Sequence, residues 1–341
     1  MSDARIPVTV LTGYLGAGKT TLLNRILSED HGQRYAVIVN EFGEIGIDAD
    51  LVTHSNEELF EMNNGCICCT VRGDLIRTLH GLLARPASSG AFDAVIVETT
   101  GLADPGPVAQ TFFVDAKLRA QLRLDSITTL VDARHITGQL ADSREAAEQV
   151  AFADQIVLNK TDLATESELQ AVERQLRRLN PLAPIQRAWR AGVALHTVLG
   201  CGGFDLDRIV ALERGHEHEQ EPEHEHGHVH DEHCGHADHI HSSGIRSVSL
   251  TSKRPMDGAR VQAWLAHLVA TQGADILRAK GIIDVAGDER RMVFQAVHMI
   301  LEGDRQRPWR DGEVRSSRLV FIGRHLDAAA LRRGFEACTF A

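Results

Sequence analysis

The residues with the clearest chemical meaning form a glycine-rich loop near the amino terminus. The segment from Gly13 to Thr20 matches the pattern G-x-x-x-x-G-K-[ST] and lies between an expected strand and an expected helix. Its glycines allow the backbone to wrap around an anion, so that several N–H groups point at phosphate oxygens. The ammonium of Lys19 can neutralise phosphate charge, and the hydroxyl of Thr20 can bind Mg²⁺. The predicted phosphate-binding residues are Gly13, Gly16, Ala17, Gly18, Lys19, Thr20 and Thr21, with Lys19 also catalytic.

A second motif predicts which base the nucleotide carries. Asn159, Lys160 and Asp162 form the pattern N-K-x-D directly after an apolar strand, at the sheet edge where ligands of open α/β proteins bind. The carboxylate of Asp162 can accept from both N1–H and N2–H₂ of guanine, whereas adenine offers no such pair of donors. The amide of Asn159 can reach the O6 and N7 acceptors, and the stem of Lys160 can lie along the base. With the phosphate loop, this motif predicts GTP in preference to ATP.

Acidic residues after two further strands can serve the triphosphate. Glu98 ends an apolar run, where a carboxylate can hold Mg²⁺ through water, and Gly101 permits the backbone to approach the γ-phosphate. The loop after the second strand carries Glu41, Glu44 and Asp48. Each of these acids can orient the attacking water, lie near Mg²⁺ or complete a metal shell, and a solvated acidic loop explains each equally well. Glu98 and Glu44 are therefore the candidate catalytic acids beside Lys19.

Three cysteines are crowded at Cys66, Cys68 and Cys69. Their side chains can converge on one ion, and the helix expected to begin near Gly73 favours the thiolate form. Thiolates are soft ligands that suit Zn²⁺ or Cu(I), with Co²⁺ as an alternative, and three sulfurs leave one tetrahedral position open. Three small buried residues without a ligand are the structural alternative, but the C-x-C-C spacing favours a metal site. A redox pair is disfavoured because the context is not that of a thioredoxin-like fold.

Histidines are concentrated in one tract. Ten of the eighteen fall between His216 and His241, interleaved with acidic residues. Neutral imidazoles can bind Zn²⁺, Ni²⁺, Co²⁺ or Cu²⁺, so the tract predicts either several weak, unselective metal sites or a solvated spacer. Large apolar side chains are nearly absent from 215–244, and this stretch is therefore expected to be a disordered linker.

Composition argues against several classes of protein. The chain has 341 residues, of which 43% are hydrophobic and 24% charged, as in ordinary soluble globular proteins. Its net charge of −11 argues against nucleic-acid binding through a general basic field, and no apolar run approaches the ~20 residues of a membrane span. The first residues show no signal-peptide pattern, and clustered cysteines in a reducing compartment bind metal more often than they form disulfides. We therefore expect a cytoplasmic protein that binds neither nucleic acid nor membrane.

The motifs require a parallel sheet to position them. Short β-branched runs alternate with helical patterns, which is typical of an α/β sheet flanked by helices. The expected strands are 6–12, 35–40, 94–98, 126–131, 155–159 and 184–187, and the expected helices are 19–28, 74–84 and 166–179. Beyond the linker, strands are expected at 245–251, 281–286, 292–297 and 318–323, with one helix around Trp264 and another from about Asp327. The prediction is an α/β P-loop NTPase domain over 1–214, the linker over 215–244 and a smaller α+β C-terminal domain over 245–341.

The assembled motifs resemble the CobW-related family of phosphate-loop GTPases, which contains zinc-transferring metallochaperones. The resemblance rests on 13–21, 40–44, 65–69, 98–105 and 159–162 and, beyond the linker, on 277–281, 294–297 and 317–323. It implies GTP hydrolysis with Mg²⁺, slow without metal or client, metal delivery to a client metalloprotein, frequent homodimerisation, and Cys66, Cys68 and Cys69 as the metal ligands. Some relatives carry an additional acid where this chain has Val39, so any role of that acid is absent. The chain lacks the large insertions associated with cobalamin-pathway members, which favours the zinc type.

These observations predict a GTP-hydrolysing metallochaperone that carries Zn²⁺ at the cysteine cluster. One alternative is a metal-storage protein, in which the histidine tract supplies the capacity and GTP only stabilises the fold. A second alternative is a maturation factor for one specific cobalt or nickel enzyme. Deletion of 215–241 separates the first alternative from the main prediction, because storage requires the tract and a tight cysteine site does not.

Overall fold

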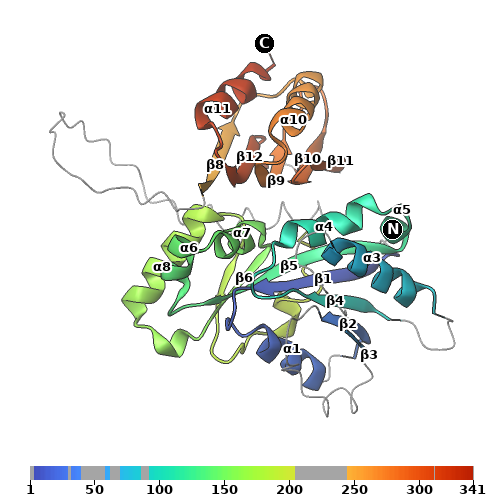
Figure 1. Ribbon diagram of the computed structural model, residues 1–341. Helices are drawn as coiled ribbons and strands as arrows, with labels where there is room; N and C mark the ends of the chain where they lie inside the picture. Colours follow the sequence, from blue (N-terminus) through green and yellow to red (C-terminus); the bar gives the residue numbers. More distant parts are fainter. Residues whose placement is uncertain are drawn as a thin grey trace.

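A computed structural model describes residues 4–29, 32–39, 58–61, 70–85, 92–203, 244–310 and 312–340. Within these ranges the chain forms two sheets, each the centre of one domain, and the C-terminal domain is stacked on the first (Figure 1). No helix in the described ranges is both long and apolar enough to cross a membrane.

The first sheet has seven strands in the order β3-β2-β4-β1-β5-β6-β7, and every neighbouring pair is parallel. β2, β4 and β6 are buried along their whole length, as expected for strands covered by helices on both faces. The predicted α/β domain is therefore confirmed, and the carboxyl ends of its strands share one edge. The strands are β1 (Ile6–Gly13), β2 (Tyr35–Val39), β3 (Glu58–Glu61), β4 (Ala94–Glu98), β5 (Leu122–Asp132), β6 (Gln155–Asn159) and β7 (Ile185–Arg187).

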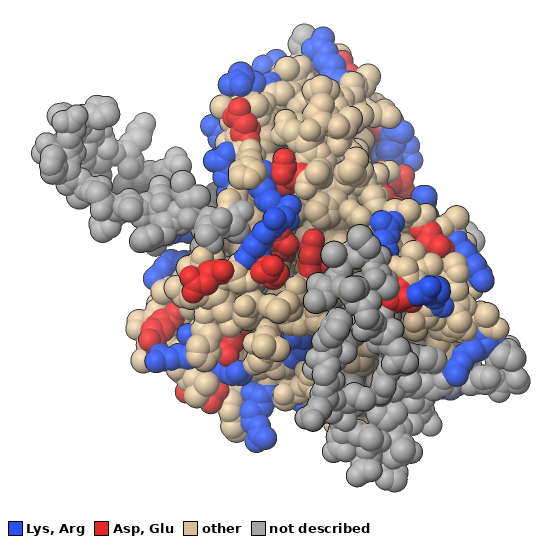
Figure 2. All heavy atoms as spheres, viewed as in Figure 1, with Lys and Arg blue, Asp and Glu red and all other residues tan. Residues whose placement is uncertain are grey.

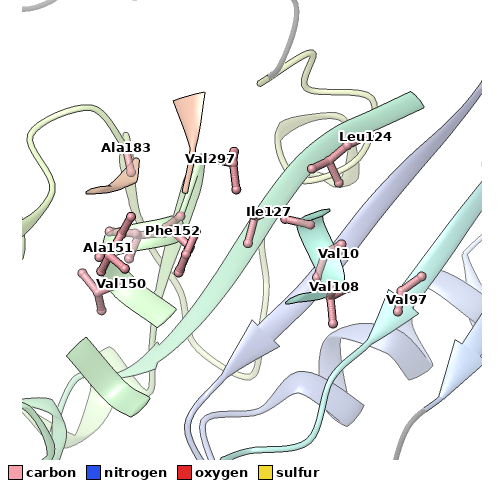
Figure 3. Packing of buried hydrophobic residues seen from close by; sticks show 14 of the residues in the cluster. Val10, Val97, Val108, Leu124, Ile127, Val150, Ala151, Phe152, Ala183 and Val297 are labelled. Carbon is pink, nitrogen blue, oxygen red and sulfur yellow. The ribbon is translucent and has the colours of Figure 1, made fainter. Parts of the chain in front are cut away.

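Helices cover both faces of this sheet. On one face α1 packs through Leu22 into a core cluster that contains Val37. On the opposite face the other helices contribute side chains such as Val108 and Phe152, which belong to the cluster around Val10 (Figure 3). The helices are α1 (Lys19–Ser28), α3 (Thr70–Leu83), α4 (Pro105–Val114), α5 (Ala116–Gln121), α6 (Ile136–Asp142), α7 (Arg144–Phe152) and α8 (Glu166–Leu179).

The second sheet has five antiparallel strands in the order β11-β10-β9-β12-β8. Helices α10 and α11 cover one face, where Leu265 packs with Phe321 and Phe335. The other face meets the first domain, because Val297 lies in the same core cluster as Phe152 (Figure 3). The elements are β8 (Ile245–Ser252), α10 (Gly258–Gln272), β9 (Ile276–Ile283), β10 (Arg290–Val297), β11 (Ile300–Pro308), β12 (Ser317–Arg324) and α11 (Ala328–Ala337).

Some sequence-based boundaries were wrong. The strand expected at 281–286 is β9, which already begins at Ile276, because Arg278 and Lys280 are charged residues buried at the domain interface. β11 was not anticipated, since this edge strand is rich in charged, exposed side chains. α4 was also missed, and the reason is local: two prolines and a glycine stand in its first turn, where proline is tolerated.

A buried charge cluster joins the two domains. Asp154, just before β6, accepts a hydrogen bond from Lys280 Nζ at 2.7 Å and another from the guanidinium of Arg278. All three side chains are 7% exposed or less. Burial raises the pKa of Asp154, but the two cations of β9 outweigh this effect and hold its pKa below the usual value. Lys280 also donates to the carbonyl of Gly203 at 2.9 Å, so the end of the described part of the first domain is held at the same point.

Asp154→Asn tests this cluster. The substitution leaves the buried Arg278 and Lys280 without the carboxylate that both contact, and we expect the free energy of unfolding to fall by about 3–5 kcal/mol, measured by denaturant titration. The pKa of Asp154 is lower in the folded than in the unfolded protein. Ionised Asp154 therefore stabilises the fold at pH values above the usual carboxyl pKa of ~4, and this stabilisation is lost as the pH falls below that value. The variant is expected to lack this component of the pH dependence.

Arg305→Gln provides the control for that measurement. It breaks the ion pair between the exposed Arg305 and Asp288 in the same domain as β9, and such surface pairs contribute at most ~1 kcal/mol. Equal stability of Asp154→Asn and the wild type would show that the cluster does not stabilise the contact between the domains.

Candidate functional site

The phosphate loop joins β1 to α1. Gly18 precedes α1 with φ +108°, a conformation that glycine adopts without strain. Lys19 is largely buried, and its Nζ donates a hydrogen bond to Gly13 O at 2.9 Å, so the ammonium is held against the first residue of the loop. Charged phosphate oxygens are stronger acceptors than a carbonyl, and the amino end of α1 adds a positive dipole end. The local geometry therefore fits a polyphosphate.

Thr20 and Glu98 meet at this loop although they are 78 positions apart in the sequence. Thr20 Oγ1 donates to Glu98 Oε1 at 3.4 Å, and Glu98 is the last residue of β4 and only 4% exposed. A hydroxyl and a carboxylate are hard oxygen ligands of the kind that Mg²⁺ prefers. The parallel pairing of β1 with β4 thus brings together the two residues that the sequence assigned to Mg²⁺.

The loop that follows β4 runs against the phosphate loop. Thr99 Oγ1 donates to Thr12 Oγ1 at 2.8 Å. A Cβ atom at Gly101 would lie 2.7 Å from the Cα of Leu15, closer than real side chains approach, so glycine is required at this crossing. A phosphate held by the first loop consequently lies beside the backbone of the second. This proximity is what a contact between Gly101 and a γ-phosphate requires.

Asn159 has a structural role that the sequence did not predict. Its Nδ2 donates to Ala17 O and its Oδ1 accepts from the Ala191 N–H, both at 2.9 Å. The side chain is 2% exposed, so it fastens the phosphate loop and the 188–191 loop to the end of β6. Asp162, in the short 3₁₀ helix after Lys160, is exposed and accessible to a base.

Asp132 is a candidate functional residue that the sequence analysis missed. Its Oδ2 accepts a hydrogen bond from Lys160 Nζ at 2.8 Å and lies 3.0 Å from His135 Nδ1. Burial raises the pKa of Asp132, but the hydrogen bonds from Lys160 and His135 more than offset this and keep its pKa below the usual value. Asp132 ends β5 opposite Asn159, the last residue of β6. An acid ending the strand beside N-K-x-D was the signal that could have identified it.

The other predicted site residues fall outside the described part of the chain: Cys66, Cys68, Cys69, Glu41, Glu44, Asp48 and the histidine tract. In the part that is described, no group of three or more His, Cys, Asp or Glu side chains is arranged to hold a metal ion. The cysteine metal site therefore stays a prediction.

Comparison with protein families gives two matches that together span most of the chain. Residues 7–187 match the CobW/HypB/UreG nucleotide-binding domain, and residues 245–339 match the cobalamin synthesis protein cobW C-terminal domain.

Individual relatives match over nearly the full length. The chain is 35% identical to the zinc chaperone YjiA of Escherichia coli K12, covering 97% of this chain and 98% of the relative. It is 31% identical to the zinc-regulated GTPase metalloprotein activator 1 of Schizosaccharomyces pombe, covering 94% and 83%. A crystal structure of Zn(II)-bound YjiA GTPase from E. coli matches with a TM-score of 0.76 and 32% identity, covering 98% of this chain and 99% of that one.

Asp132→Asn is expected to weaken guanine-nucleotide binding. The substitution removes the charge that orients Lys160. A charged but partly exposed hydrogen bond of this kind contributes about 1–2 kcal/mol, so we expect the Kd for the nucleotide to rise roughly 5- to 30-fold. The loss should be equal for GDP and for a non-hydrolysable GTP analogue, because both carry the same base. Titration calorimetry measures both, with His135→Ala, which removes the exposed partner of the same carboxylate, as the control. Unchanged affinities in Asp132→Asn would remove Asp132 from the site.

Proposed function

Because the chain belongs to the CobW/HypB/UreG family of P-loop GTPases, we propose that it is a GTP-hydrolysing metallochaperone that binds Zn²⁺ at Cys66, Cys68 and Cys69 and transfers it to a client metalloprotein. The observation that carries the proposal is the meeting of Lys19, the Thr20–Glu98 pair and the Gly101 loop at one edge of the sheet. The names of the two relatives, a zinc chaperone and a zinc-regulated GTPase metalloprotein activator, support zinc as the metal.

The described residues support the hydrolytic step through charge and position. Water attacks the γ-phosphorus, the bond to the β–γ bridging oxygen breaks, and GDP and phosphate leave. Lys19, held at the phosphate loop, would neutralise the β- and γ-phosphate oxygens. Thr20 and Glu98 would hold Mg²⁺, which supplies further positive charge there. Positioning and electrostatic stabilisation account for most of catalysis in this reaction class. Glu44 is one of the three acids in the segment after β2 that can orient the water.

Topology supports communication between nucleotide and metal. The cysteine motif lies in the connection between β3, which ends at Glu61, and α3, which begins at Thr70. β3 is parallel to β2, so the connection leaves the sheet at the same edge as the phosphate loop. Loss of γ-phosphate contacts on hydrolysis can release loops at this edge, which would change the affinity of the cysteines for Zn²⁺.

Zinc affinity in different nucleotide states tests the proposal. We expect the Kd for Zn²⁺ to differ between GDP-bound and GTP-analogue-bound protein by about 5- to 150-fold, the usual range of coupling between two sites. By linkage, saturating Zn²⁺ must change the affinity for the GTP analogue by the same factor. The triple variant Cys66→Ser, Cys68→Ser, Cys69→Ser should lose both effects, whereas Cys201→Ser, which removes a thiol beside the carbonyl of Thr197, should keep them.

Other outcomes would identify another function. Equal zinc affinity in the apo, GDP and GTP-analogue states would exclude a nucleotide-controlled chaperone. Loss of most bound zinc on deletion of 215–241, with the cysteines intact, would indicate metal storage. Tighter binding of Co²⁺ or Ni²⁺ than of Zn²⁺ would favour a maturation factor for an enzyme of that metal. Native mass spectrometry of the same samples reports metal stoichiometry and any homodimer directly.

A further inference from the structure

One buried side chain of α7 holds the loop after β4, which carries Gly101. Gln149 Nε2 donates hydrogen bonds to Gly101 O and to Ala103 O, each at 3.1 Å. The Gln149 backbone is itself fixed, because its carbonyl accepts from Thr129 Oγ1 of β5 at 2.9 Å. Since a trans peptide points its C=O and N–H in opposite directions, the bond to Gly101 O turns the following N–H, that of Leu102, away from α7.

Packing alone does not explain a glutamine at this position. The side chain is 1% exposed, and its Oε1 has no hydrogen-bond partner among the described residues. A buried amide oxygen without a partner costs stability, so an apolar residue of the same length would suit the core better. What the glutamine adds is a pair of N–H donors aimed at two carbonyls of one loop.

The residue before Gln149 connects the same helix to the C-terminal domain. Glu148 is 3% exposed, and its carboxylate accepts from Arg144 within α7 and from Arg324 at the end of β12. Arg324 is itself only 14% exposed. Figure 2 shows acidic and basic side chains gathered at the level where the two domains meet. Adjacent residues of α7 therefore contact the nucleotide-site loop on one side and the second sheet on the other.

A second contact joins the far end of that loop to the C-terminal domain. Asp104 caps α4 by accepting from the Gly106 N–H at 2.8 Å, and a Cβ atom at Gly106 would lie 2.5 Å from His298 Nε2. The His298 ring, in the turn between β10 and β11, also lies 5.2 Å from the ring of Phe152. Burial raises the pKa of Asp104, and the charge of Glu148 raises it further.

We propose that Gln149 is a positioning residue that sets the backbone of Gly101 and Ala103 for the γ-phosphate, and that α7 passes the state of this loop to the C-terminal domain through the Glu148–Arg324 pair. The inference rests on the proposed GTP hydrolysis. When the loop moves between nucleotide states, the two hydrogen bonds of Gln149 form in one state and break in the other. The position of α7, and with it the ion pair to β12, then depends on the nucleotide.

The positioning role is tested with Gln149→Met, which keeps the length of the side chain and removes its donors, and Gln149→Glu, which replaces the donors by acceptors. For both variants we expect kcat for GTP to fall about 10- to 100-fold, as for a misplaced reacting group. The Kd for GDP should change less than about threefold, because GDP lacks the γ-phosphate that the loop is proposed to contact. Gln170→Ala, an exposed glutamine of α8 that donates to Glu166, is the control. An unchanged kcat, or a parallel loss of GDP affinity and thermal stability, would overturn the role.

The link to the second domain is tested by hydrogen exchange of β12 in the full-length protein. In the wild type we expect the amides of 318–324 to exchange at different rates with GDP and with a GTP analogue. Arg324→Met should abolish this difference in exchange rate while kcat stays within about threefold of the wild type. Arg324→Lys should keep part of the difference, because a cation at this position still pairs with Glu148. Arg305→Gln should leave the difference intact.

These outcomes are independent of the zinc measurements. A nucleotide-dependent exchange difference that persists in Arg324→Met would overturn the link. If zinc affinity proves insensitive to nucleotide but Gln149→Met still lowers kcat with GDP affinity retained, the metallochaperone proposal fails and the positioning role stands.

Discussion

The nucleotide site depends on one buried amide at the end of β6. Asn159 donates to Ala17 in the phosphate loop and accepts from Ala191 in the loop after β7, so two otherwise separate segments are fixed to the same strand end. Because β5 and β6 are parallel and in register, Asp132 stands opposite this asparagine and holds Lys160. A single strand terminus thereby sets the distance between the phosphate loop and the N-K-x-D segment. An aspartate in place of Asn159 would lack the N–H donors that Ala17 requires.

The domain interface combines an apolar and a polar part with different consequences. Burial of Val297 against the first domain favours contact but tolerates sliding, because the hydrophobic effect has no preferred direction. The cluster of Asp154, Arg278 and Lys280 opposes such sliding. Each of these charges is buried, and a shift of one sheet against the other would separate it from its partner at a high cost in free energy. The apolar contacts thus hold the domains together, and the charge cluster fixes where they meet.

The local sequence pattern predicted the bounds of an element correctly where the burial of its residues agrees with their helix or strand propensity. β4 and β6 are continuous apolar runs, and α8 begins at a capping box and shows regular apolar spacing, so all three have the predicted bounds. The start of β9 was missed because the burial of Arg278 depends on Asp154, 124 positions earlier in the sequence. The role of Gln149 could not be predicted either, because nothing near it in the sequence indicates that its amide donates to the loop that follows β4. Among the described residues, the motifs predicted that Lys19, Thr20 and Glu98 gather at the sheet edge, whereas the contacts that support them depend on tertiary register.

The contacts on α7 differ in how strongly they respond to a small movement. The apolar contacts around Phe152 are many, individually weak and without a preferred direction, so a sideways shift of the helix exchanges one contact for another. The hydrogen bonds of Gln149 and the ion pair between Glu148 and Arg324 are directional, so the same shift changes their energy steeply. The domains can therefore stay in contact while the polar contacts change state. A ligand shifts such an equilibrium only by the difference in its affinity for the two states, so in the proposed coupling the contacts between the γ-phosphate and the Gly101 loop would set the upper limit on what the C-terminal domain can sense.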